Sequence, residues 1–304
     1  MNWILFFLIL FLVYLINFFN NIDSQNRKAI KYFRLGFSNM RKQKIEFSSK
    51  VMVKYICKIL SLPVRDKYYL DRLLEGSIYF SYLYYLYPEL VGQLGSKLYW
   101  VDVFQEYNIN HPKLYISKLD TKITNYHKID ESQNYILKPI YGGLGYGVKL
   151  IKGNEISKYL HNFDNFIIQE KMKDCIFKQS TIYRVNTLYT GEVFCMTRQS
   201  NTGITTQGGP FINCDNDECF RNNELKAKFT VFLNKLKNLH KTKFDKVICI
   251  GWDIMIHCQE QNVDFYCLEG NIFCATFRYA DKNYRQYIDE YKKIVNEFYT
   301  INGI

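Results

Sequence analysis

The sequence contains no C-x-x-C pair, although nine cysteines are spread over its 304 residues. Disulfide-rich secreted domains and zinc fingers place their cysteines at short, repeated spacings. Several of these cysteines lie instead in apolar runs of the kind that form buried strands. We therefore expect reduced, buried thiols in a reducing compartment.

The patterns of nucleophilic catalysis are also missing. The sequence has no G-x-S-x-G motif and no cysteine with a convincing histidine partner. His240 and His257 are both favoured as structural residues rather than catalytic ones. A chain of this length can bury one large or two smaller cores, and it shows no internal repeat and no low-complexity linker.

Acidic residues are scarce in one segment, residues 25–72. This segment has thirteen Lys and Arg against three acids, so it holds +10 of the formal net charge of +11. Such asymmetry indicates an anionic neighbour, either a membrane surface or a nucleic acid. No recognisable nucleic-acid-binding motif accompanies the basic residues, so we expect no specific nucleic-acid partner.

One long apolar run precedes the basic segment. Residues 3–19, WILFFLILFLVYLINFF, are interrupted only by Asn17 and would span about 26 Å as a helix, close to the lower limit for a bilayer. No Lys or Arg precedes the run and no A-x-A-like site follows it, which disfavours a cleaved signal peptide. We predict a transmembrane anchor over residues 1–21, with a buried helix as the alternative.

The basic flank sets the predicted orientation of this anchor. Positive residues gather on the cytoplasmic side of single-pass proteins, so the bulk of the protein is expected in the cytoplasm. The basic helical region, residues 22–94, would then lie against the anionic membrane surface.

Residues 95–304 alternate between helical and strand periodicity, which predicts an α+β fold with antiparallel strand pairs. The expected helices span residues 97–107, 154–161, 223–240 and 282–298. The expected strands span residues 113–117, 134–138, 147–151, 166–170, 181–189, 192–199, 247–257 and 263–269.

A glycine-rich stretch, YILKPIYGGLGYGVKLI at residues 135–151, follows Lys138 at the end of an apolar run. Its four glycines are Gly142, Gly143, Gly145 and Gly147. Glycines cluster where a turn needs positive φ, or where backbone amides must approach a phosphate closely. Both interpretations, a hairpin turn and a phosphate-binding loop, are open at this point.

Two strand-like segments carry acidic residues near their ends. IGWDIMI contains Asp253, and FYCLEGN ends with Glu269 and Asn271. Residues two apart in a strand share a face, so Glu269 and Asn271 can direct oxygen atoms to one point, and Asp253 can join them if the strands pair. Carboxylate and amide oxygens suit Mg²⁺. The alternative for the E-x-N pattern is an exposed turn.

Two arginines lie on a probable β-hairpin. Arg184 and Arg198 flank YTGEV, where Gly191 would occupy the turn. Arginines on facing strands can bracket an anion with their fork-shaped donors. Taken singly, each arginine is more often a surface ion-pair partner.

The order of these motifs resembles the ATP-grasp superfamily, and most closely the branch associated with sugar transfer and polysaccharide biosynthesis. The resemblance covers roughly residues 95–280. It is carried by GSKLYW, YILKPIYGGLGYGVKLI, FIIQEKM, RVNTLYT, TTQGGPFINC, IGWDIMI and LEGN. The metal motif departs from many relatives because E-G-N is followed by Ile-Phe rather than by proline.

The resemblance implies an ATP-grasp fold, in which two α+β subdomains grip ATP. The lid subdomain would span about residues 112–172, and the metal-binding subdomain about residues 173–304. The phosphates would be contacted by Lys97 and Lys138 and covered by the loop of Gly142, Gly143, Gly145 and Gly147. Adenine and ribose would lie against Gln169, Glu170 and Met172. The catalytic residues would be Lys138, Arg184 and Arg198, with the two arginines meeting the transferred phosphoryl group. One or two Mg²⁺ ions, or Mn²⁺, would be held by Asp253, Glu269 and Asn271.

The implied reaction is an ATP- and Mg²⁺-dependent ligation that releases ADP. An acyl phosphate would form on a small-molecule or sugar-linked carboxylate, and an amine or thiol would displace the phosphate, in glycan or surface-polymer biosynthesis. Two alternatives are phosphoryl transfer to a hydroxyl on the same fold, and a membrane-bound ATP-binding scaffold without catalysis.

Overall fold

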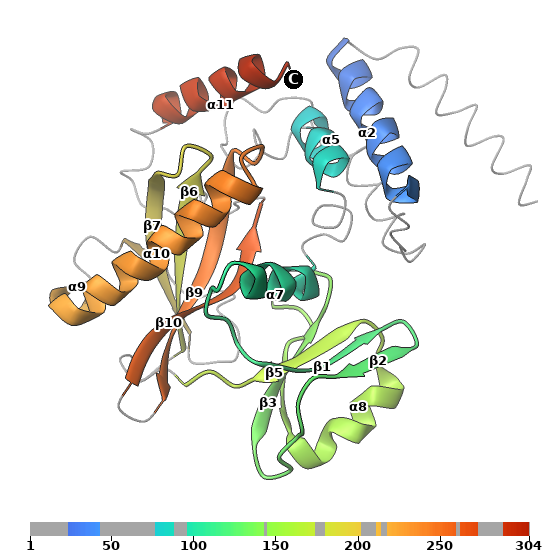
Figure 1. Cartoon of the computed structure of the whole chain (residues 1–304), viewed down its shortest axis with the longest axis vertical. Helices are drawn as coiled ribbons and strands as arrows, with labels where there is room; N and C mark the ends of the chain where they lie inside the picture. Colours follow the sequence, from blue (N-terminus) through green and yellow to red (C-terminus); the bar gives the residue numbers. More distant parts are fainter. Residues whose placement is uncertain are drawn as a thin grey trace, which may run out of the picture.

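The predicted α+β class is confirmed by the structure, a computed structural model (Figure 1). The described elements are helices and two antiparallel sheets of five strands each. The structure describes residues 24–42, 77–87, 96–142, 145–173, 180–201, 211–213, 218–259, 262–272 and 288–303.

The first sheet, sheet A, has the strand order β2-β1-β5-β3-β4. Its strands are β1 (Leu114–Leu119), β2 (Lys122–Asn125), β3 (Asn134–Pro139), β4 (Lys149–Lys152) and β5 (Phe166–Glu170). Helix α8 (Ile156–Asn162), which follows a 3₁₀ turn at Gly153–Glu155, packs on one face of this sheet. The core between them contains Tyr135, Leu137 and Ile168, because alternate residues of a strand point to the same face. Among the strands of sheet A, periodicity did not predict β2.

The second sheet, sheet B, has the strand order β10-β9-β6-β7-β8. Its strands are β6 (Ser180–Leu188), β7 (Val193–Asn201), β8 (Phe211–Asn213), β9 (Cys249–Gln259) and β10 (Asn262–Asn271). The short helix α9 (Glu218–Arg221) leads into α10 (Asn223–Lys243), which crosses one face of the sheet.

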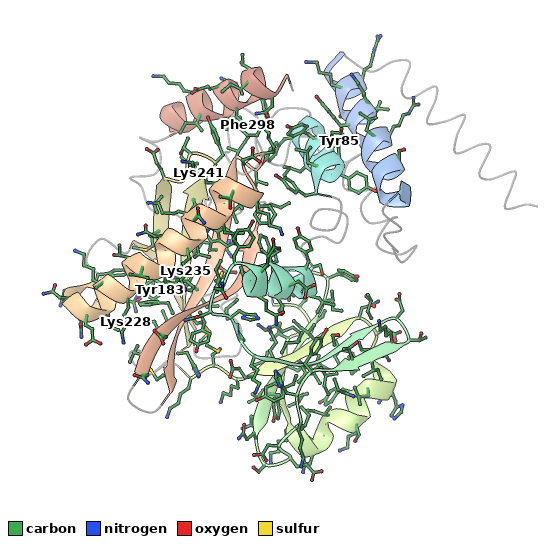
Figure 2. All side chains as sticks on the ribbon, viewed as in Figure 1. Tyr85, Tyr183, Lys228, Lys235, Lys241 and Phe298 are labelled. Carbon is green, nitrogen blue, oxygen red and sulfur yellow. The ribbon has the colours of Figure 1, made fainter. Side chains whose placement is uncertain are left out.

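Helix α10 shows why its sequence forms a helix on this sheet. The side chain of Asn222 caps it by accepting the backbone N–H groups of Glu224 (2.9 Å) and Leu225 (3.2 Å). Phe229 packs against Tyr183 of the sheet, with ring centroids 6.3 Å apart. Lysines follow α10 along its length, and Tyr183 lies beneath the helix (Figure 2).

Helix α7 (Lys97–Glu106) lies between the two sheets (Figure 1). Ser96 caps it through its Oγ, which accepts the N–H of Tyr99 at 3.2 Å. Trp100 and Phe104 belong to the core of sheet B, whereas Val101 packs with Ile167 of sheet A. Because each side of the helix is anchored to a different sheet, its N-terminal end is fixed where the sheets meet.

A buried polar network supports the structural role predicted for His240. Its Nδ1 lies 2.8 Å from Oγ1 of Thr187, and its Nε2 lies 2.6 Å from the carbonyl oxygen of Val247. The indole N–H of Trp252 donates to the same Thr187 oxygen at 2.8 Å. Burial lowers the pKa of His240 to about 4, so the ring is neutral at neutral pH and ties α10 to sheet B.

The N-terminal part is helical where the structure describes it. Helices α2 (Ser24–Lys42) and α5 (Ser77–Leu86) lie side by side, with the rings of Tyr32 and Tyr82 5.3 Å apart. Helix α11 (Ile288–Asn302) joins this group through Phe298, whose ring lies 6.3 Å from that of Tyr79. The hydroxyl of Tyr79 also accepts the N–H of Ile248 at 2.8 Å, which ties the group to sheet B.

The predicted membrane location requires correction. Among the described residues, no helix combines the length and the apolar character needed to cross a bilayer. The two longest, α2 and α10, carry repeated Lys and Arg side chains, which a bilayer-spanning helix disfavours. The predicted anchor, residues 1–21, lies outside the described residues. The expectation of a single-pass membrane protein with a cytoplasmic catalytic domain is contradicted by this finding.

The cysteine prediction is correct in part. Cys267 is a free, buried thiol in sheet B, as expected, and Cys249 is buried in the same sheet. Cys258 is disulfide-bonded, so the expectation of reduced thiols is wrong at that position.

Candidate active site

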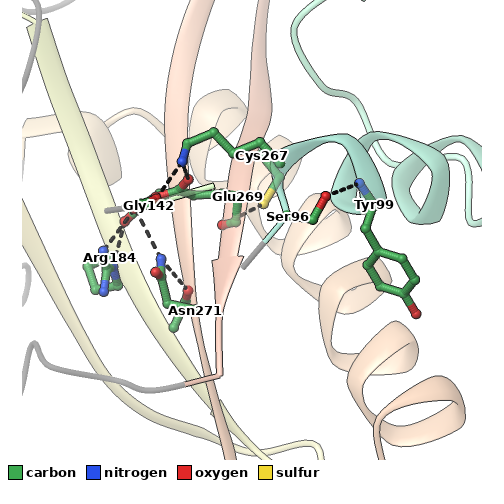
Figure 3. Close-up of polar contacts among 10 residues, drawn as sticks. Ser96, Tyr99, Gly142, Arg184, Cys267, Glu269 and Asn271 are labelled. Carbon is green, nitrogen blue, oxygen red and sulfur yellow. Dashed lines mark hydrogen bonds and ion pairs between the residues drawn. The ribbon is translucent and has the colours of Figure 1, made fainter. Parts of the chain in front are cut away.

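A row of charged residues crosses three strands of sheet B. The strand register places Arg184 of β6 opposite Asp253 of β9, and Asp253 opposite Glu269 of β10. Directly opposed residues share a face, so the three side chains project together. Arg184 grips Asp253 with two hydrogen bonds, from Nε to Oδ1 at 2.5 Å and from Nη2 to Oδ2 at 2.8 Å (Figure 3).

A second row runs beside the first one, two residues along each strand. It consists of Asn186, Gly251 and Asn271, which are Cα partners across β6, β9 and β10. The Nδ2 of Asn271 donates to Oδ2 of Asp253 at 3.3 Å and to the carbonyl of Gly251 at 3.4 Å. A Cβ at Gly251 would lie 3.0 Å from Oδ1 of Asn186 and 3.1 Å from Cδ of Arg184. The glycine therefore leaves room for the Arg184 side chain to reach Asp253.

Lys97, the first residue of α7, links three parts of the chain. Its Nζ lies 3.5 Å from Oε2 of Glu269 and donates to the carbonyl of Gly142 at 2.7 Å. Its backbone N–H donates to the carbonyl of Ile140 at 3.0 Å. One ammonium group thus connects the metal-ligand candidate Glu269 with the glycine-rich loop (Figure 3).

Lys138 joins the cluster from sheet A. Lys138 is the Cα partner of Ile167 in the pairing of β3 with β5, and Ile167 packs on α7. Both side chains therefore lie on the face of sheet A that is turned toward sheet B. Burial lowers the pKa of Lys138 to about 8, and the nearby Lys97 ammonium adds to this shift, whereas the carboxylates of Glu269 and Asp253 oppose it. The two lysines approach the carboxylates from different sheets.

The two carboxylates respond differently to this environment. Burial raises the pKa of Asp253 above its ordinary value; the Arg184 guanidinium opposes that shift and Glu269 adds to it. Burial also favours the neutral form of Glu269, but the ammonium groups of Lys97 and Lys138 outweigh it, and the pKa of Glu269 falls below its ordinary value. Two neighbouring carboxylates whose pKa values are shifted in opposite directions, with cations around them, are typical of a site that binds further charged groups.

The glycine-rich loop connects β3 and β4, which pair as an antiparallel hairpin. Gly142, Gly145 and Gly147 adopt φ values of +115°, +69° and +76°, so the turn requires these glycines. Tyr146 at its tip is 72% exposed. The hairpin interpretation is therefore correct for the connection, and contact with a phosphate stays a prediction. Gly143 lies outside the described residues.

The predicted hinge residues are held by the segment that precedes β1. Gln169 is buried, and its Nε2 donates to the carbonyl of Pro112 at 3.4 Å. The carboxylate of Glu170 accepts the N–H of Lys113 at 2.7 Å. Met172 lies in the following segment, which leads to Lys173. Contact of these residues with a nucleotide stays a prediction.

The stretch after the hinge and the segment before β1 are tied to sheet B by three hydrogen bonds in all. The backbone N–H of Lys173 donates to Nδ1 of His257 at 3.1 Å, and its carbonyl accepts the N–H of Cys258 at 2.9 Å. The carbonyl of Asn110 accepts the N–H of Cys267 at 2.8 Å. His257 thus has a structural partner, as the sequence indicated.

The two predicted arginines do not bracket one anion. Arg184 is opposite Thr197, whereas Arg198 is opposite Tyr183, the neighbouring residue whose ring packs against Phe229. Arg198 therefore lies on the opposite face of sheet B from Arg184. The cause is a register shift between Asn186 and Thr187, because one extra residue in a hairpin reverses the face of every later side chain.

The donor set fits Mg²⁺ chemically. The described residues include no group of three or more His, Cys, Asp or Glu side chains that could hold a metal. The candidate ligands are two carboxylates and one amide, Asp253, Glu269 and Asn271, all of which offer the hard oxygen atoms that Mg²⁺ prefers. A carboxylate has about four lone-pair sites, so the ion pair with Arg184 leaves Asp253 capacity for a cation.

Sequence reasoning missed three residues on this face, Asn186, Gly251 and Thr197. The first two could have been found, because Asn186 lies two residues after Arg184 and Gly251 two residues before Asp253, so strand alternation puts each on the same face. Thr197 could not be found, because its face depends on the register shift.

Comparisons with known proteins give weak similarities. No protein-family model matches the sequence, and no curated protein matches it in sequence. Among solved structures, D-alanine–D-alanine ligase from Bacillus anthracis in complex with ATP is similar with a TM-score of 0.46 and 16% identity, over 70% of this chain and 69% of that chain.

Two other solved structures are similar at the same level. The ATP-grasp ligase PsnB complexed with a minimal precursor has a TM-score of 0.45 and 13% identity, over 74% of this chain and 72% of that chain. L-amino acid ligase from Bacillus licheniformis has a TM-score of 0.40 and 8% identity, over 60% of this chain and 41% of that chain. Because these scores are low, the function of the site has to be inferred from its side chains.

Proposed function

We propose that the protein is an ATP- and Mg²⁺-dependent ligase of the ATP-grasp type, which activates a carboxylate as an acyl phosphate and joins it to an amine or thiol. The observation that carries this proposal is the ion pair of Lys97 with Glu269, close enough to Lys138 for its charge to lower the pKa of Glu269, while Arg184 binds Asp253 in the same row. Three cations around two carboxylates and an amide match what a metal-bound triphosphate requires.

Each group has a distinct role in this proposal. Lys97 and Lys138 neutralise phosphate oxygens, and the glycine loop, already bound to Lys97 through Gly142, lays its backbone amides over them. Asp253, Glu269 and Asn271 hold Mg²⁺, which when bound draws negative charge from the phosphate oxygens. Arg184, oriented by its two hydrogen bonds to Asp253, stabilises the charge of the phosphoryl group in transfer.

The reaction needs no protein nucleophile. An oxygen of the substrate carboxylate forms a bond to the γ-phosphorus, the bond from that phosphorus to the bridging oxygen breaks, and ADP leaves. The amine nitrogen then bonds to the acyl carbon, inorganic phosphate leaves, and the amine proton passes to solvent. Catalysis arises from positioning and electrostatic stabilisation.

The substrate class is the finer part of the proposal. The motif order that resembles the sugar-transfer branch supports a sugar-linked carboxylate or amino acid used in glycan or surface-polymer biosynthesis. One panel assay tests both the reaction type and the substrate class. Residues 22–304 are incubated with MgATP and individual amino acids or uronic acids, and the released ADP, AMP and phosphate are measured. Acid-dependent ADP release is expected, and AMP release would contradict the acyl-phosphate route.

The affinity for MgATP is expected to fall as the pH rises above about 8. Lys138 has a pKa of about 8 in the free protein, and the phosphates of bound ATP would raise this pKa. At pH values between the free and the bound pKa, ATP binding therefore takes up a proton. The affinity then decreases by at most about tenfold per pH unit in this window. Titrations at pH 7 to 9.5 measure this loss. Lys138→Arg keeps its charge and should flatten the profile; an equal slope in both proteins would assign the proton to another group.

A further inference from the structure

The charged row of sheet B continues beyond Arg184 onto β7. Thr197 of β7 is the Cα partner of Arg184, so it faces the same side as Asp253 and Glu269. Neighbouring strands lie about 4.8 Å apart, which puts Thr197 about 14 Å from Glu269 along the row. Lys97 and Glu269 lie toward one side of the row and Thr197 toward the other, with Arg184 between them. The row ends one strand further, at Asn213 of β8, the next Cα partner of Thr197.

The hydroxyl of Thr197 is enclosed and has no hydrogen-bond partner in the part of the chain that the structure describes. The residue is 4% exposed, and its Oγ1 is buried from solvent. A buried hydroxyl left unsatisfied destabilises a folded protein, so such an atom calls for an explanation. Thr187, on the opposite face, shows the ordinary case, because its Oγ1 bonds to both His240 and Trp252.

We propose that Thr197 forms, with Arg184, the subsite for the carboxylate of the acid substrate, a role that rests on the proposed function. A hydroxyl donates to an oxyanion, and the guanidinium beside it makes the position favourable for negative charge. The row then orders the reactants: the triphosphate lies at the Lys97 and Glu269 end, and the acid lies at the Thr197 end. The phosphoryl group is transferred from the triphosphate to the acid beside the guanidinium of Arg184.

Replacing Thr197 by valine tests this subsite in the free protein first. Valine has the same shape without the hydroxyl, so Thr197→Val is expected to raise the melting temperature by about 2–4 °C, because no hydrogen bond is lost. Thr187→Val, the matched control, should lower it, since two bonds to Thr187 are broken. A fall in melting temperature for Thr197→Val would show a structural bond and overturn the proposal.

Ligand-induced thermal shifts then identify what the hydroxyl binds. Acetate is used as the carboxylate probe and inorganic phosphate as the phosphoryl probe, each with MgADP and with chloride of equal ionic strength as the reference. Wild type and Thr197→Ser should be stabilised by acetate, and Thr197→Val should lose at least half of that shift while keeping the MgADP shift.

Each other outcome overturns the subsite. No acetate shift in wild type, an equal shift in Thr197→Val, or a loss confined to phosphate would exclude a carboxylate at Thr197; the last result would assign the hydroxyl to the phosphoryl group instead. Failure of the proposed function looks different, because wild type itself would then show no shift with MgATP.

Discussion

Replacing Glu269 with glutamine is expected to reduce acid-dependent ADP release by about a thousandfold, which corresponds to about 4 kcal/mol of transition-state stabilisation. Glutamine keeps the shape of the side chain but removes one anionic oxygen donor and the ion pair to Lys97. Steady-state assays at saturating Mg²⁺, with ATP varied, measure the loss in kcat/KM.

The same variant should gain affinity for ATP when the metal is absent. Without the Glu269 charge, Lys97 and Lys138 face the phosphates with less competition, so ATP in EDTA is expected to bind Glu269→Gln more tightly than wild type. Glu106→Gln is the matched control, since Glu106 pairs with Lys243 away from this row. Wild-type turnover in Glu269→Gln, or an equal loss in Glu106→Gln, would contradict a role in metal binding.

Gly270→Ala is expected to destabilise the protein by about 1–3 kcal/mol and to raise the KM for MgATP. A Cβ at this position would lie 2.5 Å from Cζ2 and 2.6 Å from Cη2 of Trp100, and 2.9 Å from Cζ3 of Trp252. Both indoles are fully buried, so they have no space to withdraw. Trp100 lies one turn after Lys97 on α7, so moving the helix separates Lys97 from Glu269.

A double-mutant cycle measures this contact directly. Trp100→Phe removes the ring atoms that the new Cβ would meet, so urea unfolding of Gly270→Ala/Trp100→Phe should show less destabilisation than the sum of the two single variants. Additive losses would mean that Gly270 is required for another reason, such as the geometry of the strand end.

Several strands, and the shared face of Glu269 and Asn271, were accessible from the sequence for a physical reason. Short apolar runs mark β3 and β5. E-x-N at a strand end puts Glu269 and Asn271 on one face. A short loop joins β9 and β10, so the pairing of these strands was also accessible. Asp253 lies opposite Glu269, however, only because the register shifts between Cys267 and Glu269, and the sequence carried no sign of this shift.

The face of Arg198 was not accessible, because it depends on one inserted residue. Near the turn, Thr187 pairs with Val193, but Asn186 pairs with Cys195, so Phe194 is the extra residue of a β-bulge. A hairpin without this bulge would place Arg184 and Arg198 on one face, as the sequence suggested. The same bulge brings Thr197 beside Arg184.

The role of Gly270 was also hidden, because its reason lies far away in the chain. Locally, a glycine between Glu269 and Asn271 looks like a loosened strand end. In the fold, it is the point where Trp100 of α7 meets β10, a contact between residues 170 positions apart in the sequence. Sequence spacing carries no sign of such a tertiary contact.

The most direct test of the central claim is a calorimetric titration of the wild-type protein with ATP, carried out with Mg²⁺ and again with EDTA. If Asp253, Glu269 and Asn271 hold the metal opposite Lys97 and Lys138, ATP should bind at least about tenfold more tightly with Mg²⁺. Absence of binding at millimolar ATP, or an ATP affinity that is the same with Mg²⁺ and with EDTA, would contradict the account.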